Sequence, residues 1–394
     1  MILQKLFFES LKRSPSDPPP VLVEPDNQLF EWNFSDDGSD YQSLTGLSSR
    51  KSISLATSGN SYKHHIYGEE LNGRLYCMHS NHPADEEGIG LKVVYEYSDD
   101  DGETWSNEID LFPEQSTVDD RVGNTGRIVL PMDFANINGE LFAVADVNYR
   151  DFVSVPAVRT GLGIIARQIY PNGTLGDIFW IHNADGSENP VVAVSGFPQY
   201  QYSSEIREKV YAYLDRPNFR PKTNFSDLNL SVVDVQHPTY GGLAEPVTIQ
   251  PEGYEKLYTY WKNNGRGHKI EQINDGAEFG ISEIPDPGTG NSAIVTRFWQ
   301  YNSETIFISG NSDDGNRCRL FFAISKRRSS DGVYVTEHVY NVDYQSDVTQ
   351  QFPGHGKGGG PQIVDMLVRG NKVYFFYDIK KEDVYMKFVN LDPM

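Results

Sequence analysis

Histidines cluster in one early part of the chain. Four of the nine lie between residues 64 and 82, in "YKHHIY" (62–67) and "MHSNHP" (78–83). An imidazole titrates near neutral pH, so it can take or give a proton in a reaction. The two stretches look like one strand pair, and side chains alternate across a strand, so only one of His64 and His65 is expected to face a shared cleft. The alternative is a group of solvent-facing or hydrogen-bonded histidines without a catalytic role.

Tyrosines and arginines that could complete such chemistry follow later. Tyr149 ends the pattern "LFAVADVNY", Arg167 lies in "IIARQI", and Arg266 lies in "NNGRGH" just after an aromatic strand. A tyrosine can transfer a proton, and an arginine can neutralise a carboxylate. Tyr211 and Tyr213 would share one face of a predicted strand and stack on sugar. The structural alternatives are an edge tyrosine, surface or loop charges, and core tyrosines.

Metal and phosphate motifs are not matched. The glycine-rich stretch 353–362 lacks the spacing of a phosphate-binding loop and precedes a strand pattern. The acidic run "DDDGE" lacks the ligand spacing of an EF-hand, and nothing in the spacing of His237, His268 and Cys318 supports a metal site. We therefore expect no catalytic metal and no required cofactor, and a structural ion such as calcium stays compatible with the sequence.

The composition limits the partners and the location. The formal net charge is −21, from 34 basic and 55 acidic residues, which does not favour nucleic acid. No run of 18 apolar residues predicts a membrane span, and the mean hydropathy is −0.50. The two cysteines, Cys77 and Cys318, form no disulfide framework. The start of the chain is a poor signal peptide, but a mature secreted chain would look the same, and four glycosylation sequons are present. We expect a secreted or cell-surface monomer.

Strand patterns dominate the rest of the sequence. Residues 1–26 read as a proline-containing extended lead-in, and 27–394 read as one domain with almost no helix. Polar or glycine turns followed by period-2 aromatic runs recur at roughly 45 to 70 residues, which is typical of propeller blades with inserted loops. The prediction is an all-β fold, a single β-propeller of seven four-stranded antiparallel blades, with six as the alternative. The run "VYMKFVNLD" near the C-terminus is expected to pair with an N-terminal strand. The predicted strands are "GRLYCMHS" (73–80), "KVVYEYS" (92–98), "ELFAVADVNY" (140–149), "KVYAYLD" (209–215), "KLYTYWK" (256–262), "ETIFISG" (304–310) and "KVYFFYDI" (372–379).

One turn carries a recognisable signature. "SDDDGETW" (98–105) fits the pattern S-x-D-x-G-x-T-W, called an Asp-box. In such a hairpin turn the aspartate accepts hydrogen bonds from turn N–H groups, the glycine supplies a positive φ, and the tryptophan packs between sheets. A degenerate copy lies at 273–284, with Phe279 in place of the tryptophan. The turn indicates a fold and no reaction.

These features together resemble the sialidase-like, Asp-box β-propeller superfamily. Within it the chain is similar to the branch of ulvan lyases and rhamnose–glucuronate lyases. The stretches that carry this resemblance are "HPADEEGIGLKVVYEYSDDDGETWS" (82–106), "GIIARQIYPNGTLGDIFW" (163–180), "LAEPVTI" (243–249), "YTYWKNNGRGHKI" (258–270) and "PQIVDMLVRGNKVYFFYDIKKEDVYM" (361–386).

The resemblance implies cleavage of a uronic-acid polysaccharide by β-elimination. A cation must neutralise the carboxylate before the neighbouring C5 proton can be removed by a histidine or tyrosine. The resemblance implies His64, His82 and Tyr149 as catalytic residues and Arg167 as the carboxylate clamp. Arg266 and Tyr211 are further substrate-binding candidates.

The net charge of −21 departs from what an anionic substrate favours. The acidity would have to lie on outer strands, with Arg167, Arg266 and Arg297 facing the channel. One alternative is a sialidase-like hydrolase, although "GRIVLP" (126–131) is only loosely similar to the first arginine motif of that family. The other alternative is a non-catalytic glycan-binding propeller.

Overall fold

The fold was examined in a computed structural model. It describes residues 29–34, 38–84, 90–114, 125–151, 158–183, 200–214, 243–249, 251–254, 257–263, 268–273, 281–284, 297–311, 318–347, 349–352, 354 and 359–391. The lead-in at 1–26, Arg266 and the degenerate turn around Phe279 lie outside these residues. No described helix is long and apolar enough to cross a membrane.

The described part of the chain is nearly all β and contains five sheets. Two of them come from the first half of the chain. The first sheet holds β4 (Tyr62–Leu71), β5 (Arg74–His82), β6 (Lys92–Ser98) and β7 (Ile109–Phe112). The second holds β8 (Thr125–Ile137), β9 (Glu140–Asp151), β10 (Val158–Ile169) and β11 (Leu175–Asn183), with β12 (Gln201–Tyr202) parallel to β11.

Three further sheets follow along the chain. The third holds β13 (Leu243–Ile249), β14 (Leu257–Asn263), β15 (His268–Ile273) and β16 (Ile281–Ile284). The fourth holds β17 (Arg297–Asn302), β18 (Thr305–Asn311), β19 (Arg319–Arg327) and β20 (Tyr334–Tyr344). The fifth holds β21 (Pro361–Arg369), β22 (Lys372–Ile379), β23 (Asp383–Asn390) and β3 (Lys51–Ser54). The predicted four-stranded antiparallel sheets are therefore present.

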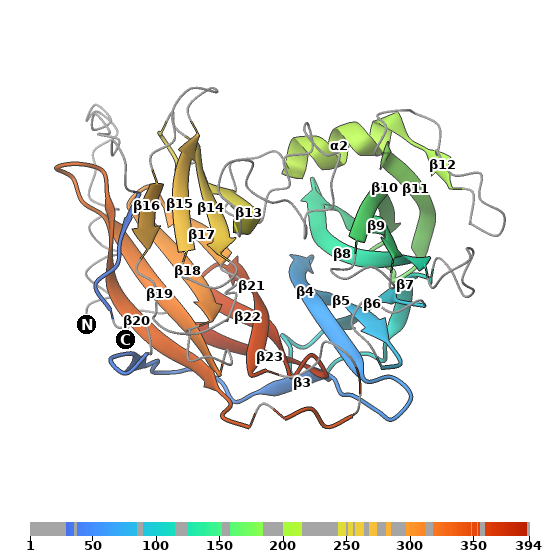
Figure 1. Ribbon diagram of the computed structural model, residues 1–394, viewed down its shortest axis with the longest axis horizontal. Coiled ribbons are helices and arrows are strands. Elements are labelled where there is room, and N and C mark those ends of the chain that lie inside the picture. The colour runs from blue at the N-terminus through green and yellow to red at the C-terminus, as the bar shows by residue number, and fades with distance from the viewer. Residues whose placement is uncertain are drawn as a thin grey trace.

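The first strands of the sheets lie on the inner side of an arc (Figure 1). Within it, β4 contacts both β21 and β8, and β17 contacts β21. Among the described residues, apolar clusters fill spaces between neighbouring sheets: Tyr76, Met78 and Val93 pack against Phe134 and Ile165 between the first and second. A similar cluster joins the fifth sheet to the first. Because consecutive sheets share a core, the arrangement of the inner strands is fixed by packing.

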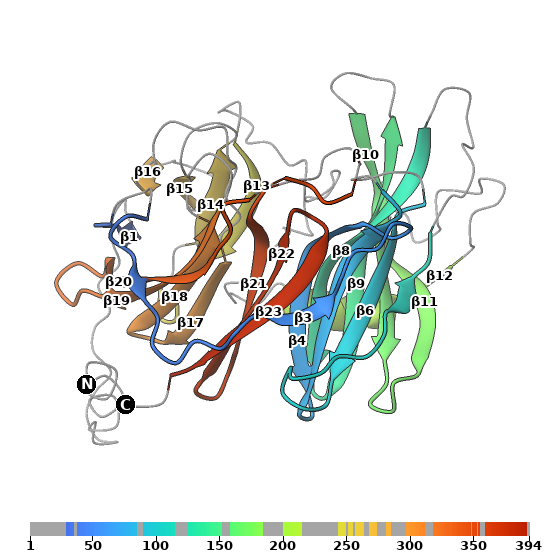
Figure 2. The ribbon, with the colours of Figure 1, turned by 90° about the horizontal axis from the view of Figure 1, so that it is seen from below.

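The N-terminal strands complete two sheets whose other strands lie late in the chain. β1 (Phe30–Glu31) and β2 (Gln42–Ser43) run parallel to β20, and β3 runs antiparallel to β23 (Figure 2). The predicted pairing of the C-terminal run with an N-terminal strand is confirmed by the pair Val384 and Ser54.

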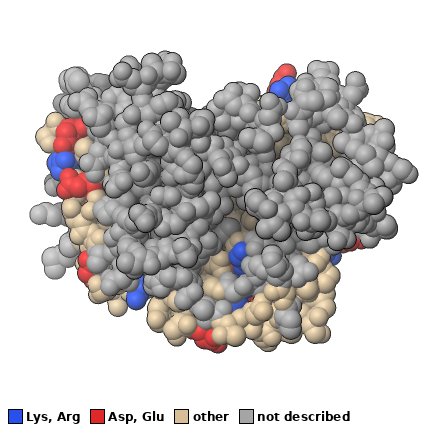
Figure 3. Space-filling model, viewed as in Figure 1, with Lys and Arg blue, Asp and Glu red and all other residues tan. Residues whose placement is uncertain are grey.

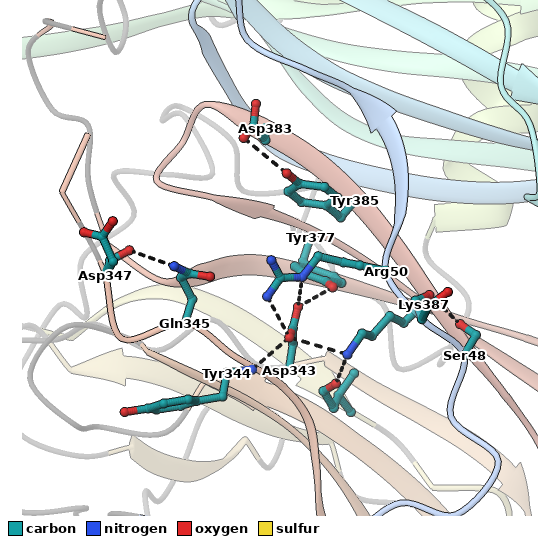
Figure 4. Close-up of polar contacts among 12 residues, drawn as sticks. Ser48, Arg50, Asp343, Tyr344, Gln345, Asp347, Tyr377, Asp383, Tyr385 and Lys387 are labelled. Carbon is teal, nitrogen blue, oxygen red and sulfur yellow. Dashed lines mark hydrogen bonds and ion pairs between the residues drawn. The ribbon is translucent and has the colours of Figure 1, made fainter. Parts of the chain in front are cut away.

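An ion cluster secures this N-terminal segment (Figure 4). Arg50 makes two hydrogen bonds to Asp343, of 2.7 and 2.9 Å, and the Tyr377 hydroxyl donates to the same carboxylate at 2.5 Å. Burial alone would raise the pKa of Asp343, but these donors outweigh it and hold the pKa below its usual value. The cluster ties residues next to β3 to β20 and β22.

The turn at 98–105 has the predicted hydrogen bonds. Asp100 accepts from the Thr104 N–H at 2.8 Å and from the Thr104 hydroxyl at 2.5 Å. Gly102 has φ of +87°, and a Cβ there would lie 2.1 Å from Met386 Cε. The Trp105 ring packs edge-on against Phe376 of the neighbouring sheet, at 6.2 Å between centroids. The turn therefore links the first and fifth sheets.

The stretch predicted as a strand at 209–215 is wrong, because residues Ser204–Leu214 form a helix, α2. The Ser203 hydroxyl accepts the Ile206 N–H at 3.2 Å and begins the helix, and Glu205 pairs with Lys209 one turn later at 3.2 Å. Ile206, Val210 and Tyr213 recur at helical spacing and pack on the second sheet. In the sequence, the alternating pattern of "VYAYL" obscured this helical periodicity.

Candidate functional site

In each antiparallel sheet, the start of the first strand and the end of the second lie side by side, at the same end of the strands. We call this the site edge. His64 is the third residue of β4, and His82 is the last of β5. Tyr149 lies near the end of β9, and Asp378 lies near the end of β22. The sheets also adjoin here, because the Lys63 N–H donates to Lys381 O at 2.9 Å. The topology thus gathers residues from distant parts of the sequence.

His64 forms a buried dyad with a carboxylate that sequence reasoning did not find. Its Nδ1 lies 2.7 Å from Asp378 Oδ2, and the two side chains are 3% and 0% exposed. The second oxygen, Asp378 Oδ1, accepts the Lys381 N–H at 2.9 Å. A carboxylate at Nδ1 fixes the tautomer with the proton on Nδ1 and the basic lone pair on Nε2. No spacing signal links residues 64 and 378, because the contact joins two sheets.

His65 lies beside His64, which corrects the expectation that only one of them could face a common space. Their ring centroids are 4.5 Å apart. The β4–β5 register shifts between His64 and Tyr67, and His65 has φ of +54°, a conformation that favours glycine. Alternation fails because this bulge inserts a residue. We refer to His64 and His65 as the histidine pair.

His82 lies at the same end of the β4–β5 pair. It is opposite Tyr62 in the register, while His64 is opposite Ser80, so the two histidines are two steps apart on neighbouring strands. His82 is 9% exposed, and its Nδ1 accepts the Ala84 N–H at 3.2 Å. This proximity is compatible with the shared role predicted for His64 and His82.

Tyr149 belongs to the site edge by its backbone. It pairs with Thr160 of β10 and with Arg127 of β8. The side chains of these residues are not described, so the acid role of Tyr149 stays a prediction that its place in β9 permits.

Arg167 lies at the opposite edge of the second sheet, against its predicted role as clamp. It is opposite Ala143 near the start of β9, whereas Tyr149 lies near the end of that strand. Its Nε donates to Gly176 O and its Nη1 to Leu111 O, both at 2.8 Å. Burial lowers the pKa of Arg167 from its ordinary value. These contacts fix the guanidinium against backbone carbonyls far from the site edge.

Arg297 is a buried arginine on one of the inner strands. It is the first residue of β17 and is 5% exposed. Its guanidinium stands 5.7 Å from the Tyr67 ring, and Nε lies 3.6 Å from Asp365 Oδ1. Asp365 Oδ2 accepts the Gly68 N–H at 2.8 Å. Within the described residues, Arg297 Nε makes no hydrogen bond, although it lies within ion-pair distance of the Asp365 carboxylate.

Tyr211, predicted to bind substrate from a strand, lies on α2 instead. Arg207 stands 4.9 Å above its ring, and the His182 ring is 6.4 Å away. Its neighbours in the apolar cluster belong to β8–β11 and the helix. A role in stacking on sugar stays a prediction.

A second polar cluster lies on the same strands and consists of Lys63, His79, Glu96 and Glu108. We call it the ion network. Lys63 is fully buried and forms an ion pair with Glu108. His79 Nε2 lies 3.2 Å from Glu96 Oε1, and His79 Nδ1 lies 2.9 Å from Ser80 O. Burial would raise the pKa of Glu108, but the Lys63 ammonium outweighs it and lowers this pKa to about 2.

The ion network contains three groups that could in principle hold a metal ion. Ligand atoms of His79, Glu96 and Glu108 lie within 4.8 Å of one another. However, Glu108 Oε1 already accepts from Ser54 and Lys63, and Oε2 accepts from Asn60 and Asn81 at 2.9 Å each. With four donors in place, one of them the Lys63 ammonium, Glu108 is a poor ligand for a further cation. We interpret the cluster as a charge-balanced structural network.

The charged side chains that the structure describes are of both signs. Described acidic and basic side chains are interspersed on the face shown in Figure 3. Several exposed carboxylates pair with cations, including Asp99 with Arg74 and Asp110 with Lys92, both at 2.6 Å. The Arg74–Asp99 pair lies at the end of the first sheet opposite the start of β4, whereas Lys92 lies at the same end as the start of β4, across β5.

Comparisons with known proteins place the fold. No family model and no curated protein matches the chain. Among solved structures it is similar to a sialidase, with a TM-score of 0.64 and 18% identity over 92% of this chain and 35% of that one. It is also similar to a leech intramolecular trans-sialidase in complex with 2,7-anhydro-Neu5Ac, with a TM-score of 0.50 and 11% identity over 86% and 70%.

The protein therefore has a sialidase-like fold. The likeness concerns the fold alone, because the identities are low. The chain spans 35% of the length of the first sialidase.

Proposed function

We propose that the protein is a carbohydrate-active enzyme that cleaves a uronic-acid-containing polysaccharide, ulvan-like or rhamnose–glucuronate, by β-elimination. The observation that carries the proposal is the buried dyad of His64 and Asp378 at the site edge, with a second imidazole in contact. A histidine whose Nδ1 proton is held by a carboxylate is a typical general base.

In this proposal His64 removes the C5 proton of the uronate. The electrons of the broken C–H bond form the C4–C5 double bond, and the C4–O bond to the leaving sugar breaks. Tyr149 or His82 gives a proton to the departing oxygen. Arg297 takes the clamp role that sequence reasoning gave to Arg167, because its guanidinium lies among the inner strands beside Tyr67 and Asp365.

The proposal includes the wider organisation expected from the sequence. The sheets would be blades of one closed β-propeller, seven or six in number, in a monomeric secreted or cell-surface protein. Arg266, in the segment between β14 and β15, would add a second cation, and Tyr211 a stacking surface. No metal or organic cofactor is needed for this elimination.

A product screen tests the proposal. Ulvan, rhamnose–glucuronate polymers and other polyuronates are incubated with the protein and followed by ultraviolet absorbance and by reducing ends. Elimination gives both signals, because each cut leaves a conjugated double bond. The His64→Gln variant is the control for a contaminating lyase, since its loss of the signal assigns the activity to this chain. Absence of the absorbance rise on every polymer contradicts the lyase proposal.

A hydrolase of sialidase type is the second candidate. The buried Arg297, whose Nε makes no hydrogen bond within the described residues, favours it in a sialidase-like fold. New reducing ends without absorbance on sialosides or uronates would support this candidate. Binding without either signal would support a glycan-binding propeller.

A further inference from the structure

Ser80 connects both members of the histidine pair. The side chain is fully buried in β5. Its hydroxyl donates to His64 O at 2.7 Å, so the one hydroxyl proton is used there. His65 Nδ1 lies 3.1 Å from the same oxygen. Because the hydroxyl hydrogen of Ser80 is engaged with the His64 carbonyl, Ser80 Oγ accepts the hydrogen bond from His65, and His65 Nδ1 must carry the hydrogen.

This contact compensates an unusual backbone. His65 has φ of +54° within the β4–β5 bulge, where no glycine eases the conformation. Such conformations persist where surrounding contacts over-determine them, and they cluster at functional sites. The Ser80 hydroxyl contacts two groups next to this backbone conformation, the His64 carbonyl and the His65 ring.

The serine is itself held from the other side of the sheet. Its carbonyl oxygen lies 2.9 Å from His79 Nδ1, and His79 is fully buried beside Glu96. Since Ser80 cannot shift without breaking this contact, the ion network fixes the position from which the hydroxyl acts.

We propose that Ser80 is a positioning residue that sets the tautomer of His65, so that the site works with two adjacent imidazoles whose basic atoms are both Nε2. Asp378 sets the tautomer of His64, and Ser80 sets that of His65. His65 then serves as a second proton-transfer group next to the base. This inference rests on the proposed function, and it adds a residue and a proton position that the function alone does not require.

The first test is the tautomer itself, in the wild-type protein. Nitrogen-15 NMR of histidine-labelled protein, with His65→Gln for assignment, distinguishes Nδ1–H from Nε2–H. The expected result is Nδ1–H for His65 near neutral pH, changing toward the Nε2–H form in Ser80→Ala. An Nε2–H tautomer in the wild type overturns the proposal. This readout does not depend on a substrate, so it still decides the positioning role if the screen finds no cleavable glycan and the proposed function fails.

The second test is kinetic. Ser80→Ala should lower kcat by roughly 10-fold to 100-fold, as loss of an outer partner of a functional histidine typically does, with KM changed less than about twofold. It should also move the pH profile of kcat, while Ser80→Thr, which keeps the hydroxyl, should restore most of the rate.

Ser61→Ala is the matched control. Ser61 is 2% exposed, and its hydroxyl donates to Pro83 O at 2.8 Å without contacting the histidine pair through that bond. Equal losses in Ser80→Ala and Ser61→Ala, or an unchanged pH profile in Ser80→Ala, would reduce Ser80 to a structural role.

Discussion

The histidine pair and the ion network lie on the same two strands, yet their chemistry differs. In the network, Lys63 is buried against Glu108, and four side-chain donors satisfy both Glu108 oxygens. In the pair, one residue has a left-handed backbone, and the two rings are in contact. Neighbouring positions 63, 64 and 65 of β4 thus divide between the two regions.

The comparison shows how one strand, β4, contributes both to the stable ion network and to the candidate site. A fully satisfied buried polar network rigidifies its surroundings. A strained bulge persists only when such surroundings hold it. We interpret the ion network as the support that allows the histidine pair to keep its conformation, with Ser80 between them.

The largest effect is expected at the histidine pair. His64→Gln keeps a donor for Asp378 but loses the basic nitrogen, so the turnover of the glycan identified by the screen should fall by about 100-fold to 10,000-fold. Initial rates measure the change, and chemical unfolding shows whether stability is retained. His338→Gln in β20 is the control and should keep the wild-type rate. A normal rate in His64→Gln would remove this residue from the mechanism.

The next effect concerns the stability of the ion network. Lys63→Met leaves the Glu108 carboxylate without its ammonium, and we expect the free energy of unfolding to fall by about 3 kcal/mol. Urea denaturation measures it. Lys51→Met, which removes a surface pair with Glu103, should cost less than about 1 kcal/mol. Adding Glu108→Gln to Lys63→Met should recover part of the loss, and strict additivity of the two changes would show that the pair is not coupled.

Arg167 and Arg297 provide a sharper contrast between support and chemistry. Arg167→Met removes two hydrogen bonds to carbonyl oxygens and should cost about 2 kcal/mol of stability. The KM for an acidic glycan should stay near the wild-type value. Arg297→Lys should instead raise KM or lower kcat, because the forked donor set is lost. A large KM increase in Arg167→Met would restore that residue as the carboxylate clamp.

The smallest effect is expected in mild acid. The folded-state pKa of Glu108, about 2, lies below the ordinary value of 4.5, so this carboxylate stabilises the fold above pH 4.5. That contribution decreases as the pH falls from 4.5 toward 2 and is absent below both values. Unfolding curves of wild type and Glu108→Gln, measured across this range, should converge as the pH falls. Curves that stay parallel would show that Glu108 does not titrate with folding.

Local patterns predicted much of the fold. Six of the seven alternating aromatic runs coincide with strands, and the turn at 98–105 formed with the hydrogen bonds that its residue types require. Period-2 reasoning failed at α2, where Ile206, Val210 and Tyr213 lie at helical spacing and pack against the second sheet. The number of blades stays a prediction, because sequence spacing does not separate a blade from an inserted loop.

The candidate site was predictable only in part. Clustered histidines pointed to the start of β4, but the partner Asp378 lies in a different sheet and carries no local signal. The bulge at His65 could not be predicted, because strict alternation of side chains along a strand does not allow for an inserted residue. The place of Arg167 could not be predicted from the sequence, because its distance along the chain from Tyr149 does not say at which edge of the sheet it lies.

The pairing of β3 with β23 has a consequence for the order of folding. The early residue Ser54 adjoins Val384, so the fifth sheet cannot be completed until nearly the whole chain has been synthesised. Closing so long a loop is slow compared with forming local hairpins. During translation β3 therefore stays without its partner strand until β23 has been made. A chain that stopped before β23 would leave β22 and β3 with unpaired edges that can pair with other nascent copies. Yield on expression should consequently depend strongly on β23, because this strand lies between β22 and β3 and joins the early and late parts of the fifth sheet.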